Sequence, residues 1–127
     1  MLRAQVALAA GDGAAMRASV EALQTWVAEH RHDASAWQLL SQCAEQQGQA
    51  LRAMRAGAES QAALGNLQGA IDRLRAGQQL ARRGASGGDF IEASVIDARL
   101  RELMSQRREL LAEQRSGRGN GRPDGSE

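Results

Sequence analysis

Apolar residues recur at helical spacing along most of the chain, separated by short polar or glycine-containing breaks. In residues 14–30 the apolar positions step by four, three and four, which places them on one face of an α-helix; they are Met16, Val20, Leu23 and Val27. The same pattern predicts helices at residues 2–9, 14–30, 34–47, 49–64, 67–82 and 89–113.

The breaks between these segments carry residues that end and begin helices. Glycine follows three of them, at Gly11, Gly48 and Gly65, and glycine just past a helix accommodates the reversal of the chain. Residues 30–33 form a polar connection in which Asp33 can cap the next helix, with Ser35 as the alternative. A longer glycine-rich loop follows residue 83, and we expect its last residue, Asp89, to cap the sixth helix.

The predicted core contains one apolar face from each helix. We expect Trp26 and Trp37 to lie in it, because aromatic residues with apolar neighbours at helical spacing are usually buried; the alternative is that they dock a peptide. Gly57 can allow two helices to approach closely. The remaining expected core residues include Leu40, Cys43, Ala44, Leu51, Met54, Ala58, Ala70, Ile71, Leu74, Leu80, Ile96, Leu100, Leu103 and Leu110.

Short connections between helices with one apolar face each favour antiparallel neighbours that stack into a solenoid. The spacing of Trp37, Leu40, Ala44 and Ala53 is similar to that of a tetratricopeptide repeat, a helix–turn–helix of about 34 residues. The expected fold is therefore all-α: a tetratricopeptide-like right-handed stack of about six antiparallel helices.

The repeat register has two solutions. If Trp37 is the signature tryptophan, the helix of residues 49–64 is the second helix of that repeat. If LGNLQGAI is the turn of a repeat, the same helix opens the next pair. The two choices exchange the concave and convex faces, so both stay open.

Composition sets the domain limits. Residues 1–114 form one expected domain, whereas residues 115–127 contain no apolar side chain and should be disordered.

The first helix spans barely two turns, so we expect the first repeat to be truncated. Its apolar stretch is too short for a signal peptide. An incomplete repeat would expose an apolar end, which favours a homodimer through the end of the solenoid.

Charge and motifs exclude several functions. Sixteen arginines and fifteen acids leave a net charge of +1, which does not suit a nucleic-acid-binding domain. No apolar run is long enough to span a membrane. No nucleophile–base pair is apparent, and the glycine-rich loop lacks the preceding strand of a phosphate-binding turn. We therefore expect no enzyme activity and no cofactor in this chain.

Three candidate sites have ordinary explanations. His30 and His32 lie two residues apart without further ligands, which suits a polar corner better than a metal site. Cys43 lies among apolar residues, where cysteine behaves as a small buried hydrophobe. Arg115, Arg118 and Arg122 among glycines are typical of a solvated tail.

A polar row in residues 34–47 is the candidate protein-binding groove. Solenoids bind on their concave surface, and this row lies there if Trp37 sets the register. The alternative is an ordinary solvated helix face. The row contains Ser35, Gln38, Gln42, Glu45 and Gln46.

Three blocks of the chain carry a resemblance to a family: LAAGDGAAM, then DASAWQLLSQCAEQQGQALRAMRAGAESQAALGNLQGAIDRL, then DFIEASVIDARLREL. Together they resemble the C-terminal repeat domain of bacterial cell-envelope zinc metallopeptidases related to the beta-barrel assembly-enhancing protease. The resemblance covers about residues 2–111. The family's catalytic H-E-x-x-H motif is missing here, so no catalytic residue is carried over and zinc is expected only in the absent peptidase domain.

The resemblance implies a periplasmic accessory module without its enzyme. Such a module would recognise or position outer-membrane protein substrates and their assembly partners, and it could contact its own peptidase domain. The alternative is a stand-alone cytoplasmic adaptor that binds a peptide or helix in its concave groove.

Overall fold

A computed structural model describes residues 4–5, 13–84 and 90–125, with side chains as far as Gly117, and every element in these ranges is an α-helix. Five helices are given bounds: α2 (Gly13–Glu29), α3 (Ala34–Gln46), α4 (Ala50–Ala63), α5 (Leu67–Arg82) and α6 (Phe90–Gly125). The expected all-α class is confirmed. The helix expected at residues 2–9 lies outside the described residues except for Ala4 and Gln5, which are helical.

The predicted ends of α2 to α5 agree with the structure to within one residue, because local chemistry determines them. The Asp33 carboxylate accepts a hydrogen bond from the backbone N–H of Ala36 at 3.0 Å, which confirms it as the cap of α3. Gly48 and Gly65 adopt positive φ values of 73° and 86° at the ends of α3 and α4, where a side chain would be strained. The expected Asp89 cap lies outside the described residues.

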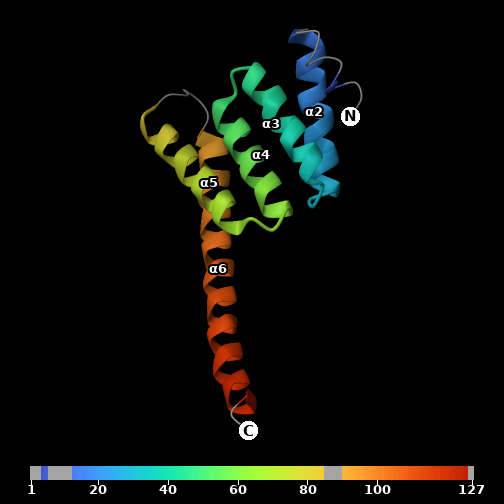
Figure 1. Cartoon of the computed structure of the whole chain (residues 1–127). Helices are drawn as coiled ribbons and strands as arrows, with labels where there is room; N and C mark the ends of the chain where they lie inside the picture. The colour runs from blue at the N-terminus through green and yellow to red at the C-terminus, as the bar shows by residue number, and fades with distance from the viewer. Residues whose placement is uncertain (1–3, 6–12, 85–89, 126–127) are drawn as a thin grey trace.

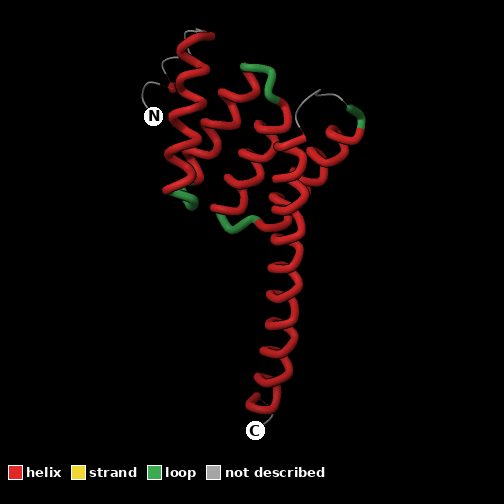
Figure 2. Tube along the Cα trace, turned by 180° about the vertical axis from the view of Figure 1, so that it is seen from behind, coloured by secondary structure: helices red, strands yellow, loops and turns green. Residues whose placement is uncertain are grey.

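Consecutive helices pack against each other from α2 to α6, and α4 also contacts α6 (Figure 1). The chain reverses direction at each short connection, so neighbouring helices are antiparallel (Figure 2). With α3 and α5 packed on either side of it, α4 occupies the middle of the arrangement.

The buried side chains form two clusters that meet at α4. One joins α2 and α3 and includes Ala56 of α4, and the other joins α4, α5 and α6. Trp37, Leu40 and Leu74 are buried as predicted. Small residues let the neighbours of α4 approach it: a β-carbon added to Gly57 would lie 3.2 Å from Nη1 of Arg73.

Two serine hydroxyls also form hydrogen bonds between α3 and α4. Ser41 Oγ donates to the carbonyl oxygen of Ala53 at 2.7 Å, and Ser60 Oγ donates to that of Ala34 at 2.9 Å. Each bond crosses between the helices, and the two lie near opposite ends of α4. They fix how the two helices are placed relative to each other.

The prediction that Trp26 belongs to the core is wrong. Its side chain is 42% exposed, stacks on the His30 ring at a centroid distance of 3.7 Å, and donates from Nε1 to Asp33 at 2.9 Å. Val27 takes the core position, four residues after Leu23, so the adjacent tryptophan turns outward.

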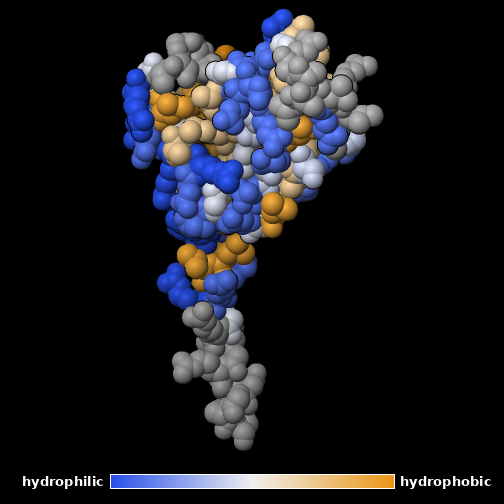
Figure 3. Space-filling view, turned by 45° about the horizontal axis from the view of Figure 1, so that its top comes forward, coloured by the Kyte–Doolittle hydropathy of each residue, from blue (hydrophilic) through white to orange (hydrophobic). Residues whose placement is uncertain are grey.

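Leu110 was also expected in the core, but it is 44% exposed and its neighbour Leu111 is 48% exposed. The apolar face of α6 packs on the body as far as Leu103 and Met104, after which the helix projects away from the other helices (Figure 1). Figure 3 shows hydrophobic atoms on the surface of this projecting part, beside the atoms drawn in grey.

The structure differs from the sequence analysis after residue 114. Disorder was expected there, whereas α6 continues as a helix to Gly125. Residues 108–117 are helical and all exposed. The expected domain boundary at residue 114 stays a prediction.

Candidate binding groove

Two cavities that share three residues lie over α4, with α6 on one side and α2 or the connection after it on the other. Their volumes are about 480 and 260 Å³. Arg31, Glu59 and Arg99 line both, so the cavities adjoin, and we call them together the α2–α6 groove. The other lining residues are Gln24, Val27, Ala28, Trp37, Arg55 and Val95 in the larger cavity, and His32, Ala62, Ala63, Leu67, Leu103 and Gln106 in the smaller.

Part of the wall of the larger cavity is apolar. Val27 and Ala28 contribute from α2, and Val95, which is 41% exposed, contributes from α6. Trp37 lines it from α3 with its indole N–H already bonded to the carbonyl oxygen of Arg31 at 2.9 Å. An apolar group that entered this cavity would therefore meet hydrocarbon and a ring whose polar atom is satisfied.

Glu92 lies at the edge of the groove and joins α6 to α4, because its carboxylate accepts hydrogen bonds from two arginines of α4. Nε of Arg55 lies 2.7 Å from Oε2 of Glu92, and Nε of Arg52 lies 3.5 Å from Oε1. Burial alone would raise the pKa of the Glu92 carboxyl, but the hydrogen bond and charge of Arg55, assisted by Arg52, outweigh it and lower this pKa. The guanidinium carbon of Arg55 also lies 5.8 Å from the centroid of the Trp37 ring, within cation–π range.

A second ion pair joins α6 to α4 within the groove. Arg99 donates from Nε and Nη2 to the two carboxylate oxygens of Glu59 at 2.7 and 2.9 Å, and from Nη1 to Glu102. Burial alone would lower the pKa of Arg99, but the bonds to Glu59 and Glu102 outweigh it and raise this pKa. Bidentate pairing fixes the guanidinium plane, so Arg99 is a rigid part of the groove wall.

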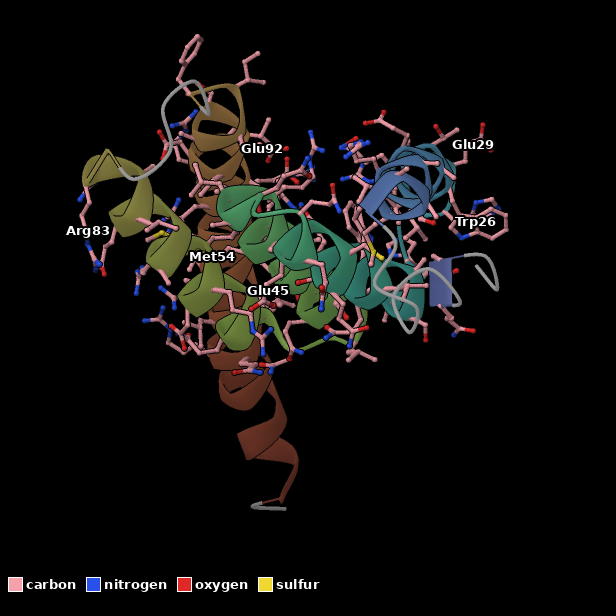
Figure 4. The ribbon with its side chains drawn as sticks, turned by 90° about the horizontal axis from the view of Figure 1, so that it is seen from above. Trp26, Glu29, Glu45, Met54, Arg83 and Glu92 are labelled. Carbon is pink, nitrogen blue, oxygen red and sulfur yellow. The ribbon has the colours of Figure 1, made fainter. Side chains whose placement is uncertain are left out.

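The predicted binding row lies elsewhere. Its five residues are all exposed on α3, and one of them, Glu45, lines a cavity. That cavity, of about 290 Å³, lies on the other side of α4 and is also lined by Ser41, Met54, Gly57 and Arg73. Figure 4 shows Glu45 and Met54 on one side of the molecule and Glu92 on the opposite side. The binding role of Ser35, Gln38, Gln42, Glu45 and Gln46 stays a prediction.

The α2–α6 groove was missed because its residues come from all five helices with described bounds and from the connection between α2 and α3. A signal was present in α4, where Arg52, Arg55 and Glu59 recur at helical spacing on one face. Their partners Glu92 and Arg99 lie 37 to 40 residues further on. Sequence spacing alone does not show that these charges meet.

The other candidate residues take structural positions. Cys43 is buried, and burial raises the pKa of its thiol, which disfavours the reactive thiolate. Within residues 4–5, 13–84 and 90–125, no group of three histidine, cysteine or acidic side chains is arranged to hold a metal ion. Among the helices in those ranges, none combines the length and hydropathy needed to cross a membrane.

The chain matches no protein-family model, no curated protein and no solved structure at a significant level.

Proposed function

We propose that this chain is a non-catalytic module that binds a segment of another protein in the α2–α6 groove. The observation that carries this proposal is the pair of adjoining cavities over α4, whose lining combines exposed apolar side chains with fixed charges. The larger cavity, at about 480 Å³, has the size of a typical ligand pocket. Apolar walls can bind side chains while charges at the edge select among them.

The finer architecture belongs to the same proposal. We regard α2, α4 and α6 as one layer of a tetratricopeptide-like right-handed stack, and α3 and α5 as the other. The contact between α4 and α6 supports this for the second half of the chain, because alternate helices touch in such an array, whereas the backbones of α2 and α4 are not in contact. In this register the groove is the concave surface, and α4 opens a helix pair instead of closing one.

The resemblance of the three sequence blocks extends the proposal to a biological setting. It favours a periplasmic accessory domain of an envelope zinc metallopeptidase that positions outer-membrane proteins or their assembly partners. The alternative is a stand-alone cytoplasmic adaptor that uses the same groove. An H-E-x-x-H motif and an export signal encoded upstream of residue 1 would support the first, and their absence from the full reading frame would refute it.

Peptide selection tests the groove directly. Random peptides displayed on phage are selected on the immobilised full chain, and binding peptides are measured again on two variants. Val95→Trp adds bulk inside the groove, whereas Gln42→Trp adds the same side chain to the exposed face of α3. We expect the first variant to abolish binding and the second to leave it unchanged. Loss of binding in Gln42→Trp alone would move the site to the α3 face.

A further inference from the structure

We propose that the α2–α6 groove selects a protein segment in which a carboxylate lies beside an apolar side chain. This inference rests on the proposed function and adds the chemistry of the ligand. It follows from the number of hydrogen-bond donors and acceptors in the groove that remain unused within the chain.

The carboxylates in the groove and at its edge already accept hydrogen bonds from arginines. Both oxygens of Glu59 accept from Arg99, and both oxygens of Glu92 accept from Arg55, with Arg52 adding a further bond. A cationic ligand would therefore share each carboxylate with an arginine that already neutralises its charge and repels a second cation. Such a contact gains little.

The arginines, in contrast, have donors to spare. Among the described residues, no hydrogen bond is donated by the Arg31 guanidinium or by Nη1 of Arg55. The lining of the larger cavity contains three arginines and one acid, Glu59. Arg99 pairs with Glu59 and Arg55 with Glu92, so Arg31 is the arginine of this lining that has no acidic partner among the described residues. Its positive charge and free N–H groups fit a carboxylate, which accepts two such bonds in one plane.

The position of these donors adds the apolar requirement. Arg31 lines the same cavity as Val27, Ala28 and Val95, so a ligand whose carboxylate reaches Arg31 also meets this apolar wall. A purely acidic segment would leave the wall in contact with water, and a purely apolar one would bury the arginine without a partner, at a cost in free energy. A segment with a carboxylate beside an apolar side chain gives Arg31 a partner and also covers the apolar wall.

The test uses the selected peptides with a matched pair of charge reversals. Arg31→Glu changes the groove, whereas Arg17→Glu makes the same change in net charge at an exposed position of α2 outside it. We expect the selected peptides to be rich in aspartate or glutamate next to leucine, valine or phenylalanine. Their affinity, measured by fluorescence anisotropy, should fall about tenfold or more in Arg31→Glu and less than about twofold in Arg17→Glu.

The other outcomes separate the two proposals. Basic or uncharged peptides that Val95→Trp still excludes would overturn the ligand chemistry and leave the groove intact as the binding site. Equal loss in both arginine variants would also overturn it, since the effect would then be one of net charge. If no peptide binds, both proposals fail. A dimer in solution that Val95→Trp dissociates would show that a second copy occupies the groove and would overturn the assignment to another protein.

Discussion

Replacement of Glu92 by glutamine tests whether the charge pairs between α4 and α6 stabilise the fold. Glutamine keeps nearly the same size and one acceptor oxygen but carries no charge. It leaves Arg52 and Arg55 without the carboxylate that both now contact at 3.5 and 2.7 Å. Since α4 and α6 are separated by α5 in the sequence, the loss falls on a long-range contact of the fold.

The expected magnitude follows from the burial of the pair. A hydrogen bond to a charged group contributes about 1.5–3 kcal/mol, and breaking a fully buried ion pair costs about 3–5 kcal/mol. The side chains of Glu92 and Arg55 are each 14% exposed, so water can solvate the arginine in part once its partner is lost. We therefore expect the free energy of unfolding to fall by about 1–3 kcal/mol near neutral pH.

The pKa of Glu92 gives the effect a pH dependence of known sign. Its folded value is lowered below the ordinary 4.5, so the folded state favours the ionised carboxyl and gains stability at pH values above 4.5. This contribution is lost as the pH falls through the lowered folded pKa, where the carboxyl becomes protonated in both states. The difference between the wild type and Glu92→Gln should therefore shrink below about pH 4.5.

Urea unfolding followed by circular dichroism measures the loss in free energy of unfolding and its dependence on pH, across a series from about pH 7 to about pH 3. Glu113→Gln is the control, because Glu113 is an exposed glutamate of the same helix that forms no ion pair within the described residues. A loss below about 0.5 kcal/mol at neutral pH, no larger than that of a surface control, would refute the energetic argument. A difference that stays constant down to about pH 3 would refute its electrostatic origin.

Three further predictions concern the core and the ends. Leu40→Ala, at a position with no exposed surface, should lower the free energy of unfolding in urea by about 2–5 kcal/mol. Removal of residues 115–127 should leave the melting temperature in calorimetry nearly unchanged, since residues 115–117 are exposed, and a large decrease would show that the tail packs on the body. Trp26→Phe should cost about 0.5–1.5 kcal/mol in urea unfolding through the lost bond to Asp33, and a cost above about 3 kcal/mol would indicate a core role after all.

The sequence was a good guide to the helices and their ends because these depend on nearby residues. Asp33 caps α3 from three residues away, and Gly48 and Gly65 reverse the chain through their own backbone angles. The position of Trp26 was harder to predict, since its periodicity fits the edge of either the buried or the exposed face. Val27 occupies the core position instead, and the hydrogen bond to Asp33 and stacking on His30 hold Trp26 outside the core.

The candidate site was less predictable. The polar row on α3 was recognised from its spacing, and the structure does place its five residues on one exposed face. Spacing cannot show which exposed face is hollow, however, because a cavity depends on helices from other parts of the chain. The α2–α6 groove needs α2, α4 and α6 together, and its charges meet across separations of up to 40 residues.

The small residues of α4 explain how one helix can serve two cores and still form the floor of a groove. Ala56 faces the cluster of α2 and α3, while Ala58 faces that of α5 and α6. Short side chains let both neighbours approach closely, so the remaining face of α4 is free to present Arg55 and Glu59. A larger residue at position 56 or 58 would push a neighbouring helix outward and change the distance across the groove. Stability and binding should therefore be coupled through α4, and a variant such as Ala56→Leu should weaken peptide binding even though it touches no ligand.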